Sequence, residues 1–572
     1  MIRAILLLIV LGLAACTETI QLREPELLAG LVSLAVTPGD QTLAISDLAA
    51  PPLTVPYAAT GHFADGSERD VTTMVAWRVD NPAPGTFPTA GRFETSQRAG
   101  GHVVVSAIAG AVTGTASLTV VVTLTVVDPT FPPPPGADTL FAPGTPVVTA
   151  DPMRSPTILY PSDATMFPQG LARILFQHRP GQRNDAVRMT FESDVLHLSV
   201  LTSADRWQPD AALWTVIAAS HPGAQTTLTV SGASTTLPGT IYASRPARLF
   251  FARTDPGGAV FYWSAASAGV WRTTLGATAA VRQDQPGGET GCIGCHAVSR
   301  DGRSVAVSRG TNETLQSFEL QPLATTISET AKYPKGWAAY SPDGTLLLVA
   351  DKGVLVLRDA ITGVPVGPAD GRVPLALKAT HPDWSPDGSA VAVALSSDID
   401  NMEIKTGAIA RIRFIDGAFG EPEVLVASNP GTNNYFPKWS PDGKFIAYVT
   451  ATTPSRGAPS AELRLIRATG GQPVSLRLAN HRVASVDDIA DLATTMPTWS
   501  PPTGDISWLA FSSTRPYGVV MPTAARAQVW MAAVDLTRDG DPSFAAFWLP
   551  SQDVGVLNNN PIWSVAPSEP AQ

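Results

Sequence analysis

Two cysteines and a histidine stand close together near the middle of the chain, in the stretch GCIGCHAVSRDG from Gly291 to Gly302. Cys292 and Cys295 are separated by two residues, and His296 follows at once. The 572 residues contain only 3 cysteines, so a pair at this spacing is notable. In the CxxCH pattern, two thiols bond the vinyl groups of haem c and the histidine ligates its iron. The stretch therefore predicts one covalently attached haem c.

Two other kinds of site use the same cysteines. A zinc site needs four ligands, but no further cysteine and no paired-histidine motif stands nearby. A structural disulfide or a redox-active CxxC pair forms in an oxidising compartment, and neither needs the adjacent histidine. Both alternatives stay open, while haem c is the interpretation that uses all three residues.

A repeated motif begins inside the same stretch. The units WAAYSPDGTLLLVA, HPDWSPDGSAVAVAL and FPKWSPDGKFIAYVT each contain a strand with an aromatic end, a tight Asp-Gly turn and a second apolar strand. CHAVSRDGRSVAVS is the first copy, and MPTWSPPTGDISWLAF and NPIWSVAP are degenerate ones. The anchoring serines lie 42, 44, 55, 60 and 64 residues apart, a period typical of propeller blades. They are Ser299, Ser341, Ser385, Ser440, Ser500 and Ser564.

The WSPDG string resembles the propeller repeats of the TolB family, and six copies imply six blades. We therefore expect residues 276–572 to form a six-bladed TolB-like β-propeller with CxxCH in its first blade. Exported proteins that combine the two features are similar to this chain, and the resemblance implies architecture and cofactor more than activity.

The repeat also predicts which residues surround the haem. Equivalent positions of successive blades lie on a ring around the propeller axis, so residues four positions before each serine should meet there. Met496 is a candidate sixth iron ligand that would raise the redox potential, and His381 is one that would lower it. The alternatives for the sixth position are Met166 from the preceding domain, another residue, or an open position. The ring residues are Cys295, Trp337, His381, Phe436, Met496 and Asn560.

Two further sets of repeated residues have structural explanations. One aromatic residue per blade at a fixed place predicts packing between blades more than an electron path. The aspartates of the repeats are expected to be turn residues and not paired catalytic carboxylates. The aromatics are Tyr340, Trp384, Trp439, Trp499 and Trp563, and the aspartates are Asp301, Asp343, Asp387 and Asp442.

The elements before the propeller also predict an all-β protein. Residues 31–126 alternate apolar segments with turns and resemble the bacterial immunoglobulin-like group 2 domain, a spacer or adhesive module, with Trp77 in its core. Residues 127–152 include PTFPPPPG, which favours a stiff polyproline II linker. Residues 153–275 predict a second β-sandwich that is loosely similar to fibronectin type III domains. The expected order is two sandwiches followed by the propeller.

The N-terminus carries targeting information. MIRAILLLIVLGLAAC pairs a basic residue with an apolar run too short to span a bilayer, which is the layout of a secretory signal. Its end resembles the lipobox of bacterial lipoproteins, which implies that residues 1–16 contain the signal and that Cys16 carries lipid. The expected location is the cell envelope, periplasmic or cell-surface, with the outer membrane favoured by Thr17 after the cysteine.

Composition and missing motifs narrow the function. A formal net charge of −10 argues against nucleic acid as a partner. No nucleophile elbow, HExxH motif or phosphate-binding glycine loop occurs, so an enzyme is not the favoured class. The main hypothesis is an envelope electron carrier with one haem c and a redox partner. The alternatives are a non-catalytic scaffold for other envelope proteins, and a haem peroxidase or gas sensor if the sixth iron position is open.

Overall fold

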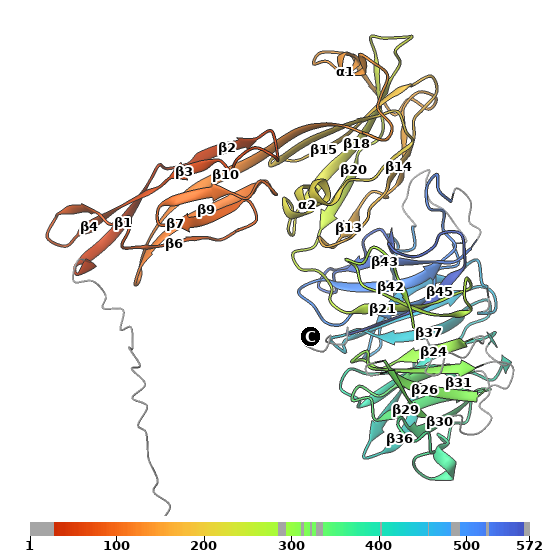
Figure 1. The fold of residues 1–572 in the computed structure, drawn as a ribbon. Helices are drawn as coiled ribbons and strands as arrows, with labels where there is room; N and C mark the ends of the chain where they lie inside the picture. Colours follow the sequence, from red (N-terminus) through yellow and green to blue (C-terminus); the bar gives the residue numbers. More distant parts are fainter. Residues whose placement is uncertain are drawn as a thin grey trace, which may run out of the picture. The chain divides into compact units, whose positions relative to one another are not determined.

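The computed structural model describes residues 28–283, 293–309, 314–320, 323–327, 336–400, 403–455, 457–481, 492–521 and 526–565. Over these residues the secondary structure is almost wholly β-strand, which confirms the predicted all-β class. Figure 1 shows the strands gathered into separate groups along the chain. The chain divides into two compact units, which meet in sequence near Val120. The predicted signal segment and Cys16 lie outside the described residues.

The first unit is a small β-sandwich. One sheet has the order β1-β4-β5, a second sheet has the order β3-β8-β7, and β6 pairs with β9 in a third. Leu34, Phe63 and Ala107 pack between sheets, and the half-buried Trp77 contacts this core and stacks on Phe87 at 5.1 Å between ring centroids. The strands are β1 (Leu31–Thr37), β2 (Gln41–Ile45), β3 (Thr54–Pro56), β4 (Ala58–Phe63), β5 (Glu68–Asp70), β6 (Ala76–Val79), β7 (Gly85–Thr89), β8 (Arg92–Thr95), β9 (Gly101–Ala109) and β10 (Val112–Val127).

The second unit begins with a mixed domain of two sheets and a helix. Its larger sheet contains β11, β19, β18, β15 and β16 in that order, with β20 beside β18 and β13 beside β20. Its smaller sheet has the order β12-β14-β17. The elements are α1 (Ala137–Leu140), β11 (Val147–Thr149), β12 (Thr157–Tyr160), β13 (Thr165–Phe167), β14 (Phe176–Arg179), β15 (Ala186–Glu192), β16 (Leu196–Thr202), β17 (Arg206–Trp207), α2 (Ala211–Ala219), β18 (Gln225–Ala233), β19 (Ile241–Ala243) and β20 (Ala247–Phe251).

This domain differs from the predicted sandwich in two ways. Helix α2 interrupts the strands, and its first turn is capped by Asp210, whose carboxylate accepts a hydrogen bond from the Leu213 amide at 2.8 Å. The predicted linker is partly folded into the domain, because α1 lies within it and β11 pairs in parallel with β19. From residue 128 onward the rest of the predicted linker, including the proline run at residues 132–135, has no helix or strand.

Six further sheets form the propeller, and each is one blade. Blade 1 contains CxxCH, blade 2 has three strands, and blade 6 combines β21 to β23 with the C-terminal β45. The blades are blade 1, β24 (Ile293–Val298), β25 (Ser304–Arg309), β26 (Thr314–Leu320) and β27 (Leu323–Ile327); blade 2, β28 (Ala338–Tyr340), β29 (Leu346–Asp351) and β30 (Val354–Asp359); blade 3, β31 (Lys378–Trp384), β32 (Ala390–Ser396), β35 (Ala408–Ile415) and β36 (Ala418–Val426); blade 4, β37 (Asn433–Trp439), β38 (Phe445–Ala451), β39 (Glu462–Arg467) and β40 (Val474–Ser475); blade 5, β41 (Thr495–Trp499), β42 (Ser507–Ser513), β43 (Gln528–Val534) and β44 (Phe547–Trp548); and blade 6, β21 (Ala259–Ser264), β22 (Gly269–Thr273), β23 (Val281–Arg282) and β45 (Asn558–Ser564). The hairpin β33 (Ile399–Asp400) with β34 (Glu403–Ile404) follows β32.

The propeller is closed by pairing of its two ends. Strand β45 pairs antiparallel with β21, with Ser564 opposite Ala259. The first strands of the repeat units contact each other in the cyclic order β24, β28, β31, β37, β41, β45 and back to β24, so they surround one central channel. Strands β21 and β22 therefore belong to the propeller, although the sequence boundary at residue 275 assigned them to the second sandwich.

Apolar side chains fill the spaces between blades. Trp384, for example, is 1% exposed and packs with Val393 and Ile412. Large buried side chains of this kind supply most of the stabilisation of such a fold. Blade 5 also contacts the preceding domain, where Thr165 forms a parallel bridge with Ala545 and the rings of Phe167 and Phe547 lie 5.4 Å apart.

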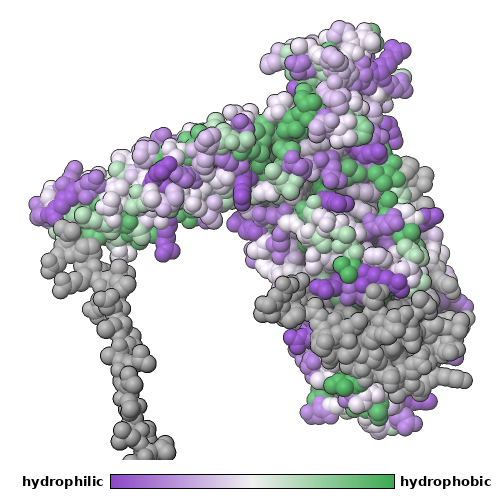
Figure 2. All heavy atoms as spheres, viewed as in Figure 1, coloured by the Kyte–Doolittle hydropathy of each residue, from purple (hydrophilic) through white to green (hydrophobic). Residues whose placement is uncertain are grey.

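The visible surface of the described residues is a mixture of hydrophilic and hydrophobic side chains (Figure 2). Exposed large apolar residues include Ile361 and Val364 after β30, at 63% and 58% exposure. Among the helices of the described ranges, none combines the length and the apolar character needed to cross a membrane.

Candidate functional site

The first strands of blades 1, 3, 4, 5 and 6 carry a bulge at the position predicted to form a ring. The pairing register breaks there, for example between Thr380 and Asp383 in β31. Four ring residues from blades 3, 4, 5 and 6 share a left-handed backbone conformation, with φ between 51° and 53°. Because this conformation recurs from blade to blade, it belongs to the fold as a repeated β-bulge. The four residues are His381, Phe436, Met496 and Asn560.

Three of the ring residues meet inside the channel. The ring centroids of Trp337 and His381 lie 5.2 Å apart, and those of His381 and Phe436 lie 3.9 Å apart. Trp337 and Phe436 also touch, at 4.8 Å, although blade 3 separates their two blades. Their side chains therefore converge on the axis side of β31 and form an aromatic cluster.

Met496 and Asn560 meet at a different point of the ring. Ser512 in β42 donates a hydrogen bond to the Met496 sulfur at 4.0 Å, and its Oγ accepts one from the Asn560 amide at 3.0 Å. The two candidate distal ligands, Met496 and His381, thus have separate sets of described neighbours. Met166 lies buried in β13 of the preceding domain, where it pairs with Phe250.

Of the CxxCH residues, the structure describes the side chain of His296. Cys292 lies outside the described residues, and Cys295 is described as part of β24 without its side chain. His296 occupies the bulge position next to the ring, where blades 3 to 6 have the buried prolines Pro382, Pro437, Pro497 and Pro561. It is 2% exposed, and its Nδ1 lies 3.4 Å from the Asn560 side-chain amide.

The His296 imidazole has the properties required of a metal ligand. Its Nε2 is buried without a hydrogen-bond partner in the structure. Burial lowers the pKa of His296 to about 4, so the ring is neutral near pH 7 and a nitrogen lone pair is available. This orphaned, neutral nitrogen fits the iron-ligand role that CxxCH predicts. In the described part of the chain, no three His, Cys, Asp and Glu residues are grouped as candidate metal ligands.

His381 shares two of these properties and is packed between aromatic rings. Its Nε2 also lacks a partner, and burial, followed by the positive charge of Lys438, holds its pKa well below the ordinary value. The Phe436 amide lies 3.5 Å from its Nδ1, and the Trp337 and Phe436 rings pack against it.

The serine and aspartate of the motif stabilise the turns, as predicted. In blade 3 the Ser385 Oγ donates to Asp387 at 2.6 Å and accepts from the Ala390 amide at 3.0 Å. The same pair of hydrogen bonds holds the turn of blade 4 through Ser440 and Asp442. The hydrogen bond from Ser385 is the main cause that lowers the pKa of Asp387.

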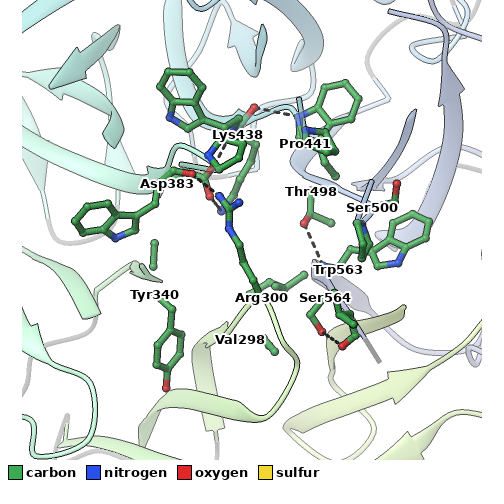
Figure 3. Close-up of a pocket in the computed structure, with 18 of the residues that line it drawn as sticks. Val298, Arg300, Tyr340, Asp383, Lys438, Pro441, Thr498, Ser500, Trp563 and Ser564 are labelled. Atoms are coloured by element: carbon green, nitrogen blue, oxygen red, sulfur yellow. Dashed lines mark hydrogen bonds and ion pairs between the residues drawn. The ribbon is translucent and has the colours of Figure 1, made fainter. Parts of the chain in front are cut away.

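The channel also contains a cavity that the sequence analysis did not predict. It measures about 360 Å³ and is lined by residues of all six blades at and just before the anchoring serines. We call this cavity the funnel. Its charged lining residues are Arg300, Asp383 and Lys438, and Figure 3 shows Arg300 extending from its turn toward the other two. The aromatic lining residues are Tyr340, Trp384, Trp439, Trp499 and Trp563.

The aromatic residues thus have two roles. Tyr340 and Trp439 pack in the apolar clusters between blades, as predicted, while also lining the funnel. Trp499 and Trp563 donate their indole N–H groups to the carbonyls of Lys438 and Gly257, at 3.1 and 3.0 Å. Packing between blades was the predicted role of these aromatics, and the structure adds that the same rings line the funnel.

A signal for the charged residues was present in the repeat alignment. Arg300 stands one position after its serine, where blades 2 to 5 have proline. Asp383 and Lys438 stand two positions before theirs, where the other blades have alanine, threonine or isoleucine. Departures from the repeat at channel-facing positions would have identified all three.

Known proteins resemble this chain only in fold. No family model and no curated relative matches it. A putative TolB from Agrobacterium tumefaciens is 16% identical, covers 54% of this chain and 99% of its own, and has a TM-score of 0.31. TolB from Acinetobacter baumannii is 14% identical over 59% of this chain and 79% of its own, at a TM-score of 0.36. A dihydro-heme d1 dehydrogenase is 16% identical, covers 52% of this chain and 55% of its own, and has a TM-score of 0.31.

Proposed function

We propose that this chain is an exported, lipid-anchored binding protein whose propeller funnel receives part of a partner protein in the cell envelope. The observation that carries the proposal is the funnel itself, a concave cavity with aromatic walls and a few convergent charged groups. Ligand sites in proteins typically have this composition, because apolar walls give affinity and a few polar groups give orientation. Indole rings and arginine are also the side chains that contribute most at protein interfaces.

Site-specific photocrosslinking in intact producing cells tests this proposal. A crosslinking amino acid at Val565, which lines the funnel and is 48% exposed, is expected to capture a defined protein. The matched control places it at Val354 in β30, which is 40% exposed and lies outside the funnel lining. Products of equal yield from both positions, or none from Val565, would refute a partner in the funnel.

A second function is favoured by the CxxCH residues. We propose that Cys292 and Cys295 hold one haem c and that His296 ligates its iron, so that the protein exchanges electrons with an envelope redox partner. The buried, unpartnered Nε2 and the neutral state of His296 support the assignment. When bound, haem supplies one-electron redox chemistry. Met496 and His381 are the proposed candidates for the distal position, and an open position would instead favour peroxidase chemistry or gas sensing.

The haem proposal is tested on full-length protein exported from cells that also express a haem-attachment system. Its intact mass is expected to include one haem, and the reduced protein should show a sharp α band. Replacing both cysteines, Cys292→Ser with Cys295→Ser, should remove the added mass. Met496→Ala and His381→Ala should both retain the added mass, and only the variant that lacks the true distal ligand should have a changed spectrum. Absence of added mass in the wild-type protein would refute this second function and leave the first intact.

A further inference from the structure

Arg300 departs from the repeat, and its side chain extends from its turn across the funnel. It lies in the turn after β24, where the equivalent residue of blades 2 to 5 is a proline, such as Pro386. Its guanidinium crosses from blade 1 to blade 3 and donates to the Trp384 carbonyl at 2.6 Å. The side chain is only partly buried and lines the cavity. Arg300 therefore places a cation inside the funnel (Figure 3).

The carboxylate beside Arg300 in the funnel lining has a second cationic partner. Asp383 is the acidic residue of the lining, and it accepts from the Lys438 ammonium at 3.0 Å and from the Trp439 amide at 2.8 Å. Asp383 is thus shared between Lys438 and Arg300, and the funnel lining contains two cations and one carboxylate. The described side-chain hydrogen bond of Arg300 goes to a neutral carbonyl. Burial lowers the pKa of Arg300, while the nearby carboxylates of Asp383 and Asp387 oppose this effect.

A second polar group of the funnel has no partner inside the protein. Ser500 lines the cavity and is 3% exposed, and its Oγ forms no hydrogen bond in the structure. In blades 1 to 4 the equivalent hydroxyl donates to the turn aspartate, but in blade 5 that aspartate is replaced by Pro502. A buried hydroxyl without a partner costs free energy unless a ligand accepts from it.

The shape of the channel favours the end of a chain over a loop. The aromatic cluster of Trp337, His381 and Phe436 lies three residues before the funnel-lining aromatics of blades 2 to 4, so its three rings occupy the channel there. A loop must enter and leave through the same mouth, whereas a terminus needs room for one backbone. A cavity of about 360 Å³ is at the small end of ligand pockets and suits a single chain end.

We propose that the funnel binds the C-terminal carboxylate of a partner polypeptide, with Arg300 as the cationic group that receives it and Ser500 as an additional donor. Guanidinium and carboxylate match in charge and in planar geometry, so they form stronger hydrogen bonds than neutral groups do. The indole and proline walls then contact the apolar side chains of the last residues. This inference rests on the proposed binding function of the funnel and specifies its ligand.

The test uses three matched synthetic hexapeptide arrays of the same sequences, probed with purified full-length protein. The first array presents a free C-terminal carboxylate, the second a C-terminal amide, and the third an amide after an added glutamate. We expect binding to the first array alone, with affinity about 10-fold or more above that for the amides. Arg300→Gln should remove this preference, while Arg303→Gln, an exposed arginine of the same turn, should keep it.

Each other result contradicts a specific step. Equal binding to acids and amides that is lost on Val565→Trp would refute the carboxylate inference and retain the funnel as a binding site. Equal binding to the glutamate-bearing amides would show that any carboxylate suffices, which refutes the chain end. Binding that no funnel substitution changes, or no binding to any array, would refute both the inference and a peptide-binding funnel.

Discussion

Blades 1 and 3 are built on the same motif, yet blade 1 replaces two prolines of blade 3 with side chains that can do chemistry. In both, a serine hydroxyl donates to the turn aspartate, at 2.5 Å from Ser299 and 2.6 Å from Ser385. Blade 3 has proline three residues before the serine and directly after it, at Pro382 and Pro386. Blade 1 has His296 and Arg300 in their places. The shared serine and aspartate form the turn of each blade, whereas the two replaced prolines distinguish blade 1 from blade 3.

Stability does not explain the two replacements. His296 buries an imidazole nitrogen without a partner, and Arg300 brings a cation into a partly buried funnel. Unsatisfied polar groups of this kind cost about 1 to 3 kcal/mol each, whereas proline has no side-chain polar atom to satisfy. This cost applies to the His296 nitrogen, whereas the Arg300 guanidinium donates to the Trp384 carbonyl; both residues supply chemistry that proline lacks, which is why we assign them to the two proposed sites.

The largest expected effect concerns the turn that all regular blades share. Ser385→Ala removes a hydrogen bond to Asp387 and leaves the buried Ala390 amide without its acceptor. We expect a loss of about 2 to 3 kcal/mol in the free energy of unfolding, since an unsatisfied buried donor adds its desolvation cost. Urea unfolding at pH 7 measures the change.

Ser500→Ala is the matched control for that substitution. The Ser500 hydroxyl is equally buried but has no partner, so its removal should change stability by less than about 0.5 kcal/mol. A loss as large for Ser500→Ala as for Ser385→Ala would show that the two turns are stabilised alike, and that Ser500 is not free to serve a ligand.

Much of the propeller was predictable because its repeat is local. Ser385, Asp387 and Gly388 lie within four residues, so one turn motif predicts a hairpin wherever it occurs. Six copies then predict six blades, and the structure contains six sheets around one channel. The bulge ring followed from the same alignment, because equivalent residues of a closed ring must face the axis.

The parts that were not predicted depend on contacts between distant residues. Strand β21 resembles a sandwich strand in sequence, and only its pairing with β45, some 300 residues later, places it in blade 6. The funnel appears only when residues such as Arg300 and Lys438 from different blades are brought together. Helix α2 had a local signal, the Asp210 cap before an apolar run, that the strand-rich surroundings obscured.

A second, smaller effect separates the ring residues of blades 3 and 4. His381→Phe copies Phe436 of the next blade and removes a buried histidine whose pKa is held low by burial. Such a histidine stays neutral in the folded protein but is protonated in the unfolded chain, so it lowers the free energy of unfolding as pH falls below about 6.5. In the wild-type protein this histidine should lower the free energy of unfolding by up to about 1.4 kcal/mol per pH unit, or about 2 kcal/mol between pH 7 and pH 5. The variant should lack this contribution.

Unfolding free energies of both proteins at pH 7 and pH 5 test this. Trp337→Phe is the control, because it changes packing in the same aromatic cluster without removing a titrating group. The wild-type pH dependence should survive in the control and diminish in His381→Phe. An unchanged dependence in His381→Phe would mean that His381 is protonated in the folded state or accessible to water.

The smallest effect on stability, and the sharpest test of the comparison, comes from making blade 1 regular. His296→Pro restores the residue that blades 3 to 6 have at the bulge, where the ladder pairing is already interrupted and no backbone donor is required. The substitution removes an unsatisfied nitrogen and restricts the unfolded chain, so the protein without haem should be more stable by about 0.4 to 1 kcal/mol. Haem-loaded protein should instead lose the spectrum of its histidine ligand. His296→Pro protein that is destabilised without haem by more than about 1 kcal/mol would show that the imidazole contributes to the fold of blade 1, and the argument that His296 is present for its chemistry would fail.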